Sequence, residues 1–202
     1  MNRWLALIPL ALLVGLVVFA ALKLGDVASR SLTQGQTQGN EYRPSALVGQ
    51  PIPQTVLPIL TGTEPGPGQV DLKTAGVGKP MLVNVFASWC APCRVEHPRL
   101  MALREQGVAV VGVAWKDDPV ATRAFLNELG DPYSIVLVDR EGRAGLDLGI
   151  TGAPETFAVD AMGKVVAKFS GPLVSDAEVE RLVQAMQAPA RPLPTAMPRP
   201  AD

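Results

Sequence analysis

The residues best suited to chemistry are the two cysteines of the chain, Cys90 and Cys93. The apolar run 81–87 before them predicts a buried strand, and a helix is expected from Ala91 to about Glu105. Cys90 would then lie at the helix N-terminus, where free N–H groups stabilise a thiolate. Cys93, one turn further along, would be shielded and suited to resolve a mixed disulfide. The pattern predicts a redox-active pair.

Two other functions of the pair stay open on the residues alone. A purely structural bridge would close a very short loop and stabilise the fold by only about 2 kcal/mol. A metal site of this spacing usually brings a second pair of ligands, and the chain has only one histidine, His97. His97 beside the pair could complete a copper site, but its spacing favours a surface histidine or a modest effect on pKa. No cofactor or resident metal is expected.

Strand and helix patterns alternate after the cysteines. Asp118 is expected to cap a helix that begins at Pro119, and Ser175 with Glu178 forms a capping box for the last helix. The pattern predicts an α/β fold, a mixed sheet with helices on both faces. The remaining expected elements are strands 107–115 and 134–139, a helix ending at 129, a short helix 143–148, and a hairpin of strands 156–159 and 164–169.

Two motifs resemble a known family. The segment 84–98 (Asn-Val-Phe-Ala-Ser-Trp-Cys-Ala-Pro-Cys-Arg-Val-Glu-His-Pro) and the later 152–157 (Gly-Ala-Pro-Glu-Thr-Phe) resemble the thioredoxin superfamily. More narrowly, they are similar to the membrane-anchored DsbE or CcmG proteins of cytochrome c biogenesis, over about residues 48–186. The resemblance implies a reductase of apocytochrome c, or of a partner thiol protein that serves haem ligation, re-reduced by a transmembrane electron donor.

The resemblance also implies further site residues. Pro154 matches the cis-proline of the superfamily, and the backbone of Ala153 would meet an extended substrate. The superfamily commonly has a buried Asp six residues before the first cysteine, where this chain has Asn84. Glu96 is therefore the expected general base for Cys93. The remaining residues expected to contact substrate are Trp89, Ala91, Pro92 and Glu155.

The two ends of the chain differ in composition from its centre. Residues 4–22 are uncharged and long enough to cross a bilayer, so 1–24 is expected to be a transmembrane anchor, with a cleaved signal peptide as the alternative. A polar flexible linker, 25–46, and a proline-rich disordered tail, 188–202, would flank a thioredoxin-like domain at 47–187. Positive charge ahead of the apolar run predicts that the N-terminus lies inside and the rest of the chain outside. The family resemblance then implies a bacterial inner membrane, with the catalytic domain on the periplasmic side.

The charge of the chain argues against nucleic acid as a partner, and the motifs leave three functions open. The formal net charge is −1, with 18 basic and 19 acidic residues and no block of like charge, so nucleic acid is not an expected partner. A reductase of cytochrome c maturation is the first function, a general exported disulfide reductase the second and a copper-delivery protein the third. A peroxidase is excluded because the chain has no lone peroxidatic cysteine.

Overall fold

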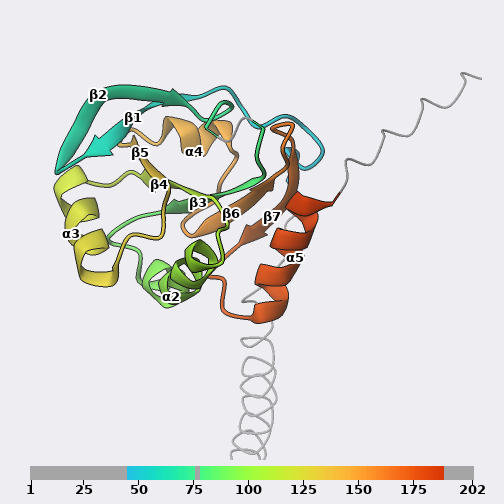
Figure 1. The fold of residues 1–202 in the computed structure, drawn as a ribbon. Coiled ribbons are helices and arrows are strands. Elements are labelled where there is room, and N and C mark those ends of the chain that lie inside the picture. The colour runs from blue at the N-terminus through green and yellow to red at the C-terminus, as the bar shows by residue number, and fades with distance from the viewer. Residues whose placement is uncertain (1–44, 76–77, 189–202) are drawn as a thin grey trace, which may run out of the picture. The chain divides into compact units, whose positions relative to one another are not determined.

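The computed structural model describes residues 45–75 and 78–188, which form a seven-stranded mixed sheet with helices on both faces (Figure 1). The strand order is β2-β1-β5-β4-β3-β6-β7. The elements are β1 (Val56–Thr61), β2 (Glu64–Asp71), β3 (Met81–Phe86), α2 (Ala91–Glu105), β4 (Val110–Trp115), α3 (Pro119–Leu129), β5 (Ile135–Asp139), α4 (Arg143–Asp147), β6 (Glu155–Val159), β7 (Val165–Ser170) and α5 (Asp176–Gln187).

The centre of the sheet is made of three parallel strands, β3, β4 and β5. The connections through α2 and α3 run in one direction across the sheet, and right-handed crossovers therefore place both helices on the same face. The antiparallel hairpin β6–β7 joins the other side of β3, and α5 returns over the face that carries α2. The predicted α/β fold and its caps at Asp118 and Ser175 are confirmed.

Alternating side chains of the central strands build two separate apolar cores. The first core lies under α2, α3 and α5 and contains both cysteines, together with Leu82, Phe86 and Ala114 of the strands. The second core lies on the opposite face under α4 and the segment before β1. It contains the intervening strand residues, among them Met81, Val83, Val85, Val111, Val113 and Phe157. The redox pair therefore belongs to one face of the sheet.

The hairpin β1–β2 was absent from the sequence-based prediction. Its strands contain Pro58, Pro65 and Pro67, residues that interrupt a strand pattern. The structure accommodates them because β2 is an edge strand and β1 pairs antiparallel with β5 only at Ile59 and Leu137. Gly66 allows the two strands to approach closely, since a Cβ there would lie 2.2 Å from the hydroxyl of Thr61.

The predicted anchor, linker and tail fall almost entirely outside the described residues. Within 45–75 and 78–188, none of the helices combines the length and the apolar character needed to cross a membrane. The anchor over 1–24 therefore stays a prediction, as do the domain boundaries.

Candidate active site

The two cysteines form a disulfide at the N-terminus of α2. Cys90 caps the helix and Cys93 lies in its first turn, with a Cα–Cα distance of 5.3 Å. The backbone N–H of Cys93 donates to Cys90 Sγ at 3.2 Å, so a helix N–H group is aimed at the first sulfur. Both cysteines are buried, whereas the intervening Ala91 and Pro92 are exposed. The predicted helix 91–105 and the placement of the pair at its start are confirmed.

The residues just before Cys90 are tied to the end of β4. The buried Asp117 accepts hydrogen bonds from the backbone N–H and the hydroxyl of Ser88, each at 2.7 Å. It also accepts one from the hydroxyl of Thr122 in α3, at 2.8 Å. The exposed indole of Trp89 donates to the carbonyl of Lys116 at 3.1 Å. These contacts hold the cysteine loop against a neighbouring loop.

Asp117 was missed by the sequence analysis, although a signal was present. Asp117 follows β4 as Ser88 follows β3, and these strands are parallel, with Phe86 opposite Ala114. The carboxyl ends of parallel strands meet at one edge of a sheet, so a carboxylate after β4 was a candidate neighbour of the cysteine loop.

Pro154 lies between α4 and β6, and the peptide bond from Ala153 to Pro154 is cis, as predicted. Ala153 packs against the first core, which contains Cys90 and Cys93. Pro154 is buried, and its carbonyl accepts a hydrogen bond from the backbone N–H of Gly171 at 2.9 Å, which ties the loop to the end of β7. The substrate contacts expected of this loop and of Trp89 remain predictions.

Glu96 is buried in the first core, one helical turn after Cys93. Its Oε1 accepts from the side-chain amide of Asn84, and its Oε2 accepts from the backbone N–H of Leu173, both at 2.9 Å. Burial raises the pKa of Glu96 to about 7, against the opposing effect of these two N–H donors. A carboxyl group that gains and loses its proton near neutral pH suits the predicted exchange of a proton with Cys93.

Glu155 is also buried, but on the opposite face of the sheet. Its Oε2 lies 2.6 Å from Nζ of the buried Lys168, and its Oε1 accepts from the backbone N–H and the hydroxyl of Thr151, both at 2.9 Å. Lys168 also donates to the carbonyl of Gly149 at 3.3 Å. The ion pair links β6 to β7 within the hairpin, and the hydrogen bonds of its two members to Thr151 and Gly149 tie the loop before Pro154 to that hairpin.

The prediction of a surface histidine at position 97 was wrong. His97 is 2% exposed, its Nε2 lies 2.9 Å from the carbonyl oxygen of Gly130, and its ring meets Phe125 edge-on. Burial lowers the pKa of His97 despite the opposing effect of the Gly130 carbonyl. The sequence could not reveal this burial, because a lone polar residue in a helix is compatible with either face.

Arg94 points toward α3 and makes two hydrogen bonds of 2.8 Å to Glu128. The charge of this arginine is therefore matched by an exposed carboxylate on the neighbouring helix. Its side chain also lies over the ring of Phe125. Within the described part of the chain, no group of three or more His, Cys, Asp or Glu side chains is arranged to hold a metal ion.

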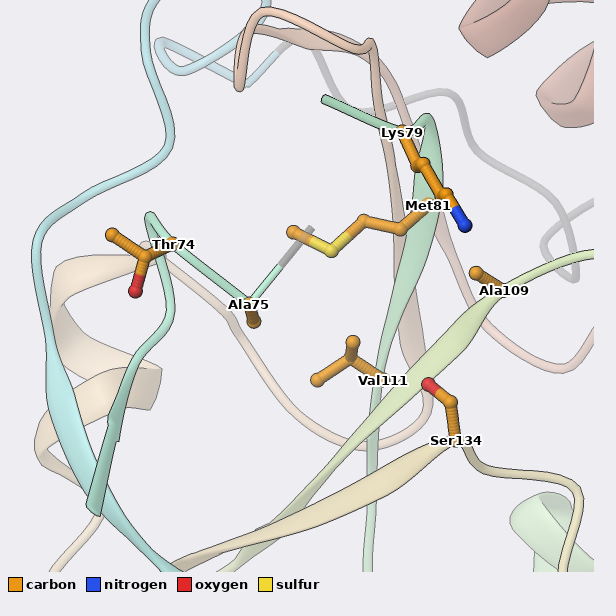
Figure 2. Close-up of a pocket in the computed structure, with 7 residues that line it drawn as sticks. All are labelled: Thr74, Ala75, Lys79, Met81, Ala109, Val111 and Ser134. Carbon is orange, nitrogen blue, oxygen red and sulfur yellow. The ribbon is translucent and has the colours of Figure 1, made fainter. Parts of the chain in front are cut away.

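A cavity of about 200 Å³ lies at the other end of the central strands (Figure 2). Met81 is the first residue of β3, whereas the cysteines follow its last residue, so this cavity is remote from the redox pair. None of the predicted site residues lines it. Its walls are formed by Thr74, Ala75, Lys79, Met81, Ala109, Val111 and Ser134.

Comparison with known proteins places this site in a family. The Redoxin family model matches residues 47–186. The chain is 41% identical over 171 residues to "Thiol:disulfide interchange protein DsbE" of Pseudomonas fluorescens biotype C, covering 85% of this chain and 86% of the relative. It is 43% identical over 139 residues to "Thiol:disulfide interchange protein HelX" of Rhodobacter capsulatus, covering 69% and 77%.

The solved structures agree with the sequence comparisons. The crystal structure of a thio-disulfide isomerase from Thermus thermophilus matches with a TM-score of 0.55 and 29% identity, over 68% of this chain and 96% of that one. The thioredoxin-like fold expected from the sequence is confirmed. The chain belongs to the Redoxin family and, within it, to the DsbE and HelX thiol:disulfide interchange proteins, and it is a thiol–disulfide oxidoreductase.

Proposed function

We propose that this oxidoreductase reduces the disulfide of apocytochrome c, or of a partner thiol protein, before haem is attached. The observation that carries the proposal is the geometry of the pair. Cys90 caps α2 with a helix N–H aimed at its sulfur, and the cis-Pro154 loop packs on the core that holds both cysteines. The DsbE and HelX names of the relatives support the interchange chemistry.

The proposed reaction transfers two electrons from the reduced pair to the client. The Cys90 thiolate attacks one sulfur of the client disulfide, forms a mixed disulfide and releases the other sulfur, which takes up a proton. Cys93 loses its proton and attacks Cys90 Sγ, which releases the second client thiol. The products are a client dithiol and the Cys90–Cys93 disulfide, the state seen in the structure. A transmembrane dithiol donor would then reduce the pair again.

Glu96 is the proposed acceptor of the Cys93 proton. It lies one turn further along α2, and its pKa of about 7 lets the ionised form take up a proton at slightly alkaline pH. The alternative base of the superfamily, a carboxyl group on the central strand, is replaced by the amide of Asn84, which donates to Glu96.

The proposed location is the periplasmic side of a bacterial inner membrane. The uncharged segment 4–22 and the preceding Arg3 support an anchor with the oxidoreductase domain outside. Spheroplasts test this location, because the periplasmic face of their membrane is open to added protease. A protease added outside should digest the domain of the full chain and leave the anchor with the membrane, whereas a protected domain would contradict the location.

The reductase direction is tested by the reduction potential of the full chain in detergent. Fluorescence of Trp89 and Trp115 reports the redox state, because both indoles lie beside the cysteine loop, 6.0 Å apart. We expect a potential near or below about −200 mV, as in reducing thioredoxin-like proteins. A value near about −120 mV, the range of strong oxidants, would reject the reductase assignment.

The client is tested by trapping. Cys93→Ser should accumulate a mixed disulfide with an oxidised apocytochrome c peptide, while Cys90→Ser, the matched control, should accumulate none. Equal trapping of an unrelated disulfide peptide would favour a general exported reductase over a cytochrome c maturation enzyme. Pro154→Thr should also prolong the mixed disulfide if the loop contacts the client.

A further inference from the structure

The side-chain amide of Asn84 is fully hydrogen-bonded at the centre of the first core. Its nitrogen donates to Glu96 Oε1 at 2.9 Å and to the hydroxyl oxygen of Thr156 at 3.0 Å. Its oxygen accepts from the hydroxyl of Tyr133 at 2.8 Å. The two ends of an amide are nearly equal in shape, so its orientation is set by the groups that face it.

Tyr133 is the group that faces the oxygen end. Its side chain is 6% exposed and stacks on Phe86 with ring centroids 4.6 Å apart. Gly112 of β4 makes room for the ring, since a Cβ at that position would lie 2.8 Å from the ring carbons. The ring therefore has a fixed place, and its hydroxyl is aimed at Asn84.

We propose that Tyr133 is a positioning residue of the redox site, which holds the amide of Asn84 with its N–H toward Glu96. The proposal rests on the proposed function in one respect, namely that Glu96 exchanges a proton with Cys93. Tyr133 touches neither the cysteines nor the client in this scheme. It acts through Asn84, whose N–H stabilises the ionised carboxylate that accepts the proton.

Loss of the Tyr133 hydroxyl would remove the contact that holds the oxygen end of the amide, so the amide could rotate when Glu96 is protonated. After rotation, the oxygen of Asn84 would face Glu96 Oε1, the position that its N–H occupies in the native chain. A carbonyl oxygen beside a carboxylate disfavours the ionised form, because both atoms carry partial negative charge. Glu96 would then keep its proton to higher pH and would accept the Cys93 proton less readily at pH 7.

Other titratable groups lie on the elements that pack around Glu96, and this rotation leaves the ion pair of Arg99 and the hydrogen bonds of Glu178 in place. Cys93 lies one turn before it, and Arg99 on the same helix is ion-paired with Asp176 at the start of α5. Glu178 of α5 binds the backbone N–H groups of Val174 and Ser175, next to the Leu173 N–H that binds Glu96. From the side of β5, Tyr133 itself is titratable, and burial raises its pKa well above the usual value.

The test is a carboxyl ¹³C NMR titration of the full chain in its disulfide form, with the Glu96 signal assigned by its loss in Glu96→Gln. We expect Tyr133→Phe to raise the titration midpoint of Glu96 by about half a pH unit or more. The pH midpoint for client release from a mixed disulfide should rise by the same amount. Phe125→Leu is the control, because it perturbs the same aromatic cluster without touching Asn84.

A folded Tyr133→Phe protein with an unchanged Glu96 midpoint would overturn the proposal, as would an equal shift in Phe125→Leu. If Tyr133→Phe does not fold, a measurement on the native chain tests the proposal instead. A hydrogen-bonded Tyr133 hydroxyl proton should exchange slowly with water and show an NMR cross-peak to the side-chain amide of Asn84. Fast exchange would overturn the proposal. The NMR titration needs no client, so it tests Tyr133 independently of the proposed function. If the Glu96 midpoint shifts but the pH profile of client release does not, the role of Glu96 as proton acceptor is rejected, whereas the positioning role of Tyr133 stands.

Discussion

Glu96 and Glu155 are two buried carboxyl groups on opposite faces of the same sheet, and their partners differ. Glu96 accepts from an amide and a backbone N–H under α2. Glu155 lies within 2.6 Å of the ammonium group of Lys168 and binds the loop before Pro154. Thr156 directs its side chain to the Glu96 face while its neighbour Glu155 points to the other, because successive residues of a strand face opposite sides.

The difference separates a group that can exchange protons from a group that holds structure. A buried carboxyl without a cation is easier to protonate, and burial raises the pKa of Glu96 to about 7. A buried carboxylate with a cation at contact distance forms an ion pair, and such a pair fixes the relative positions of the segments it joins. The face that carries the cysteines has the first kind of group, and the opposite face has the second.

Breaking the ion pair should have the largest effect on stability. Lys168→Met leaves the Glu155 carboxylate buried without its cation, and we expect the free energy of unfolding to fall by about 3–5 kcal/mol. Urea denaturation of the domain measures the change. Lys164→Met, outside the ion pair, is the control and should cost far less. Adding Glu155→Gln to Lys168→Met should recover part of the loss, and no recovery would show that the packing of the lysine stem dominates.

Titration of Glu96 should make stability depend on pH. Between about pH 4.5 and pH 7 the folded chain holds a proton that the unfolded chain has released, so the free energy of unfolding falls as pH rises. The amplitude expected from a pKa raised from 4.5 to about 7 is about 3 kcal/mol. This contribution is complete below pH 4.5 and is lost above pH 7.

The measurement compares the native chain with Glu96→Gln, both in the disulfide form, by urea denaturation from pH 4 to pH 8. The comparison is needed because His97, whose pKa burial lowers, changes stability in the opposite direction with pH. Relative to the native chain, Glu96→Gln should gain about 3 kcal/mol between pH 4.5 and pH 8. Glu105→Gln at the exposed end of α2 is the control, and a constant difference across the range would contradict the assignment.

The same contrast should be visible in catalysis. In single-turnover release of a client peptide from its mixed disulfide with Cys90, Glu96→Gln should slow the step by about 100-fold at pH 8 and abolish its rise through pH 7. Glu155→Gln should retain the shape of the pH profile, since Glu155 lies on the other face. A profile that flattens equally in both variants would contradict the division of roles between the two carboxyl groups.

The sequence predicted the elements that carry the redox pair with little error. The bounds of α2 and α3 were correct, because Asp118 is a good cap and Pro92 and Pro119 mark first turns. The central strands were visible as continuous apolar runs, as expected for strands covered on both faces. The cis peptide before Pro154 came from the family resemblance and not from local propensity.

The long-range partners of polar residues could not be predicted. Nothing in the local sequence couples Tyr133 to Asn84, 49 positions away, or Lys168 to Glu155. His97 was misplaced for the same reason, because its burial depends on Gly130 and Phe125, which meet it only in the folded chain. Asp117 differs, because its place after a strand parallel to β3 was a signal in the sequence. The local pattern predicts which face a strand residue occupies, but the tertiary fold decides what lies across from it.

The smallest effect expected is that of Thr151→Ala, which removes one hydrogen bond to Glu155 and leaves the ion pair intact. The backbone N–H of Thr151 still donates to Glu155 Oε1, so we expect the free energy of unfolding to fall by only about 1 kcal/mol. The loss should be equal at pH 5 and pH 8, since no group on the Glu96 face changes its partners. Urea denaturation at the two pH values measures it, with the native chain as reference. A loss that differed between the two pH values would mean that the two faces are coupled through β6, and the separation of a proton-exchanging face from a structural face would have to be abandoned.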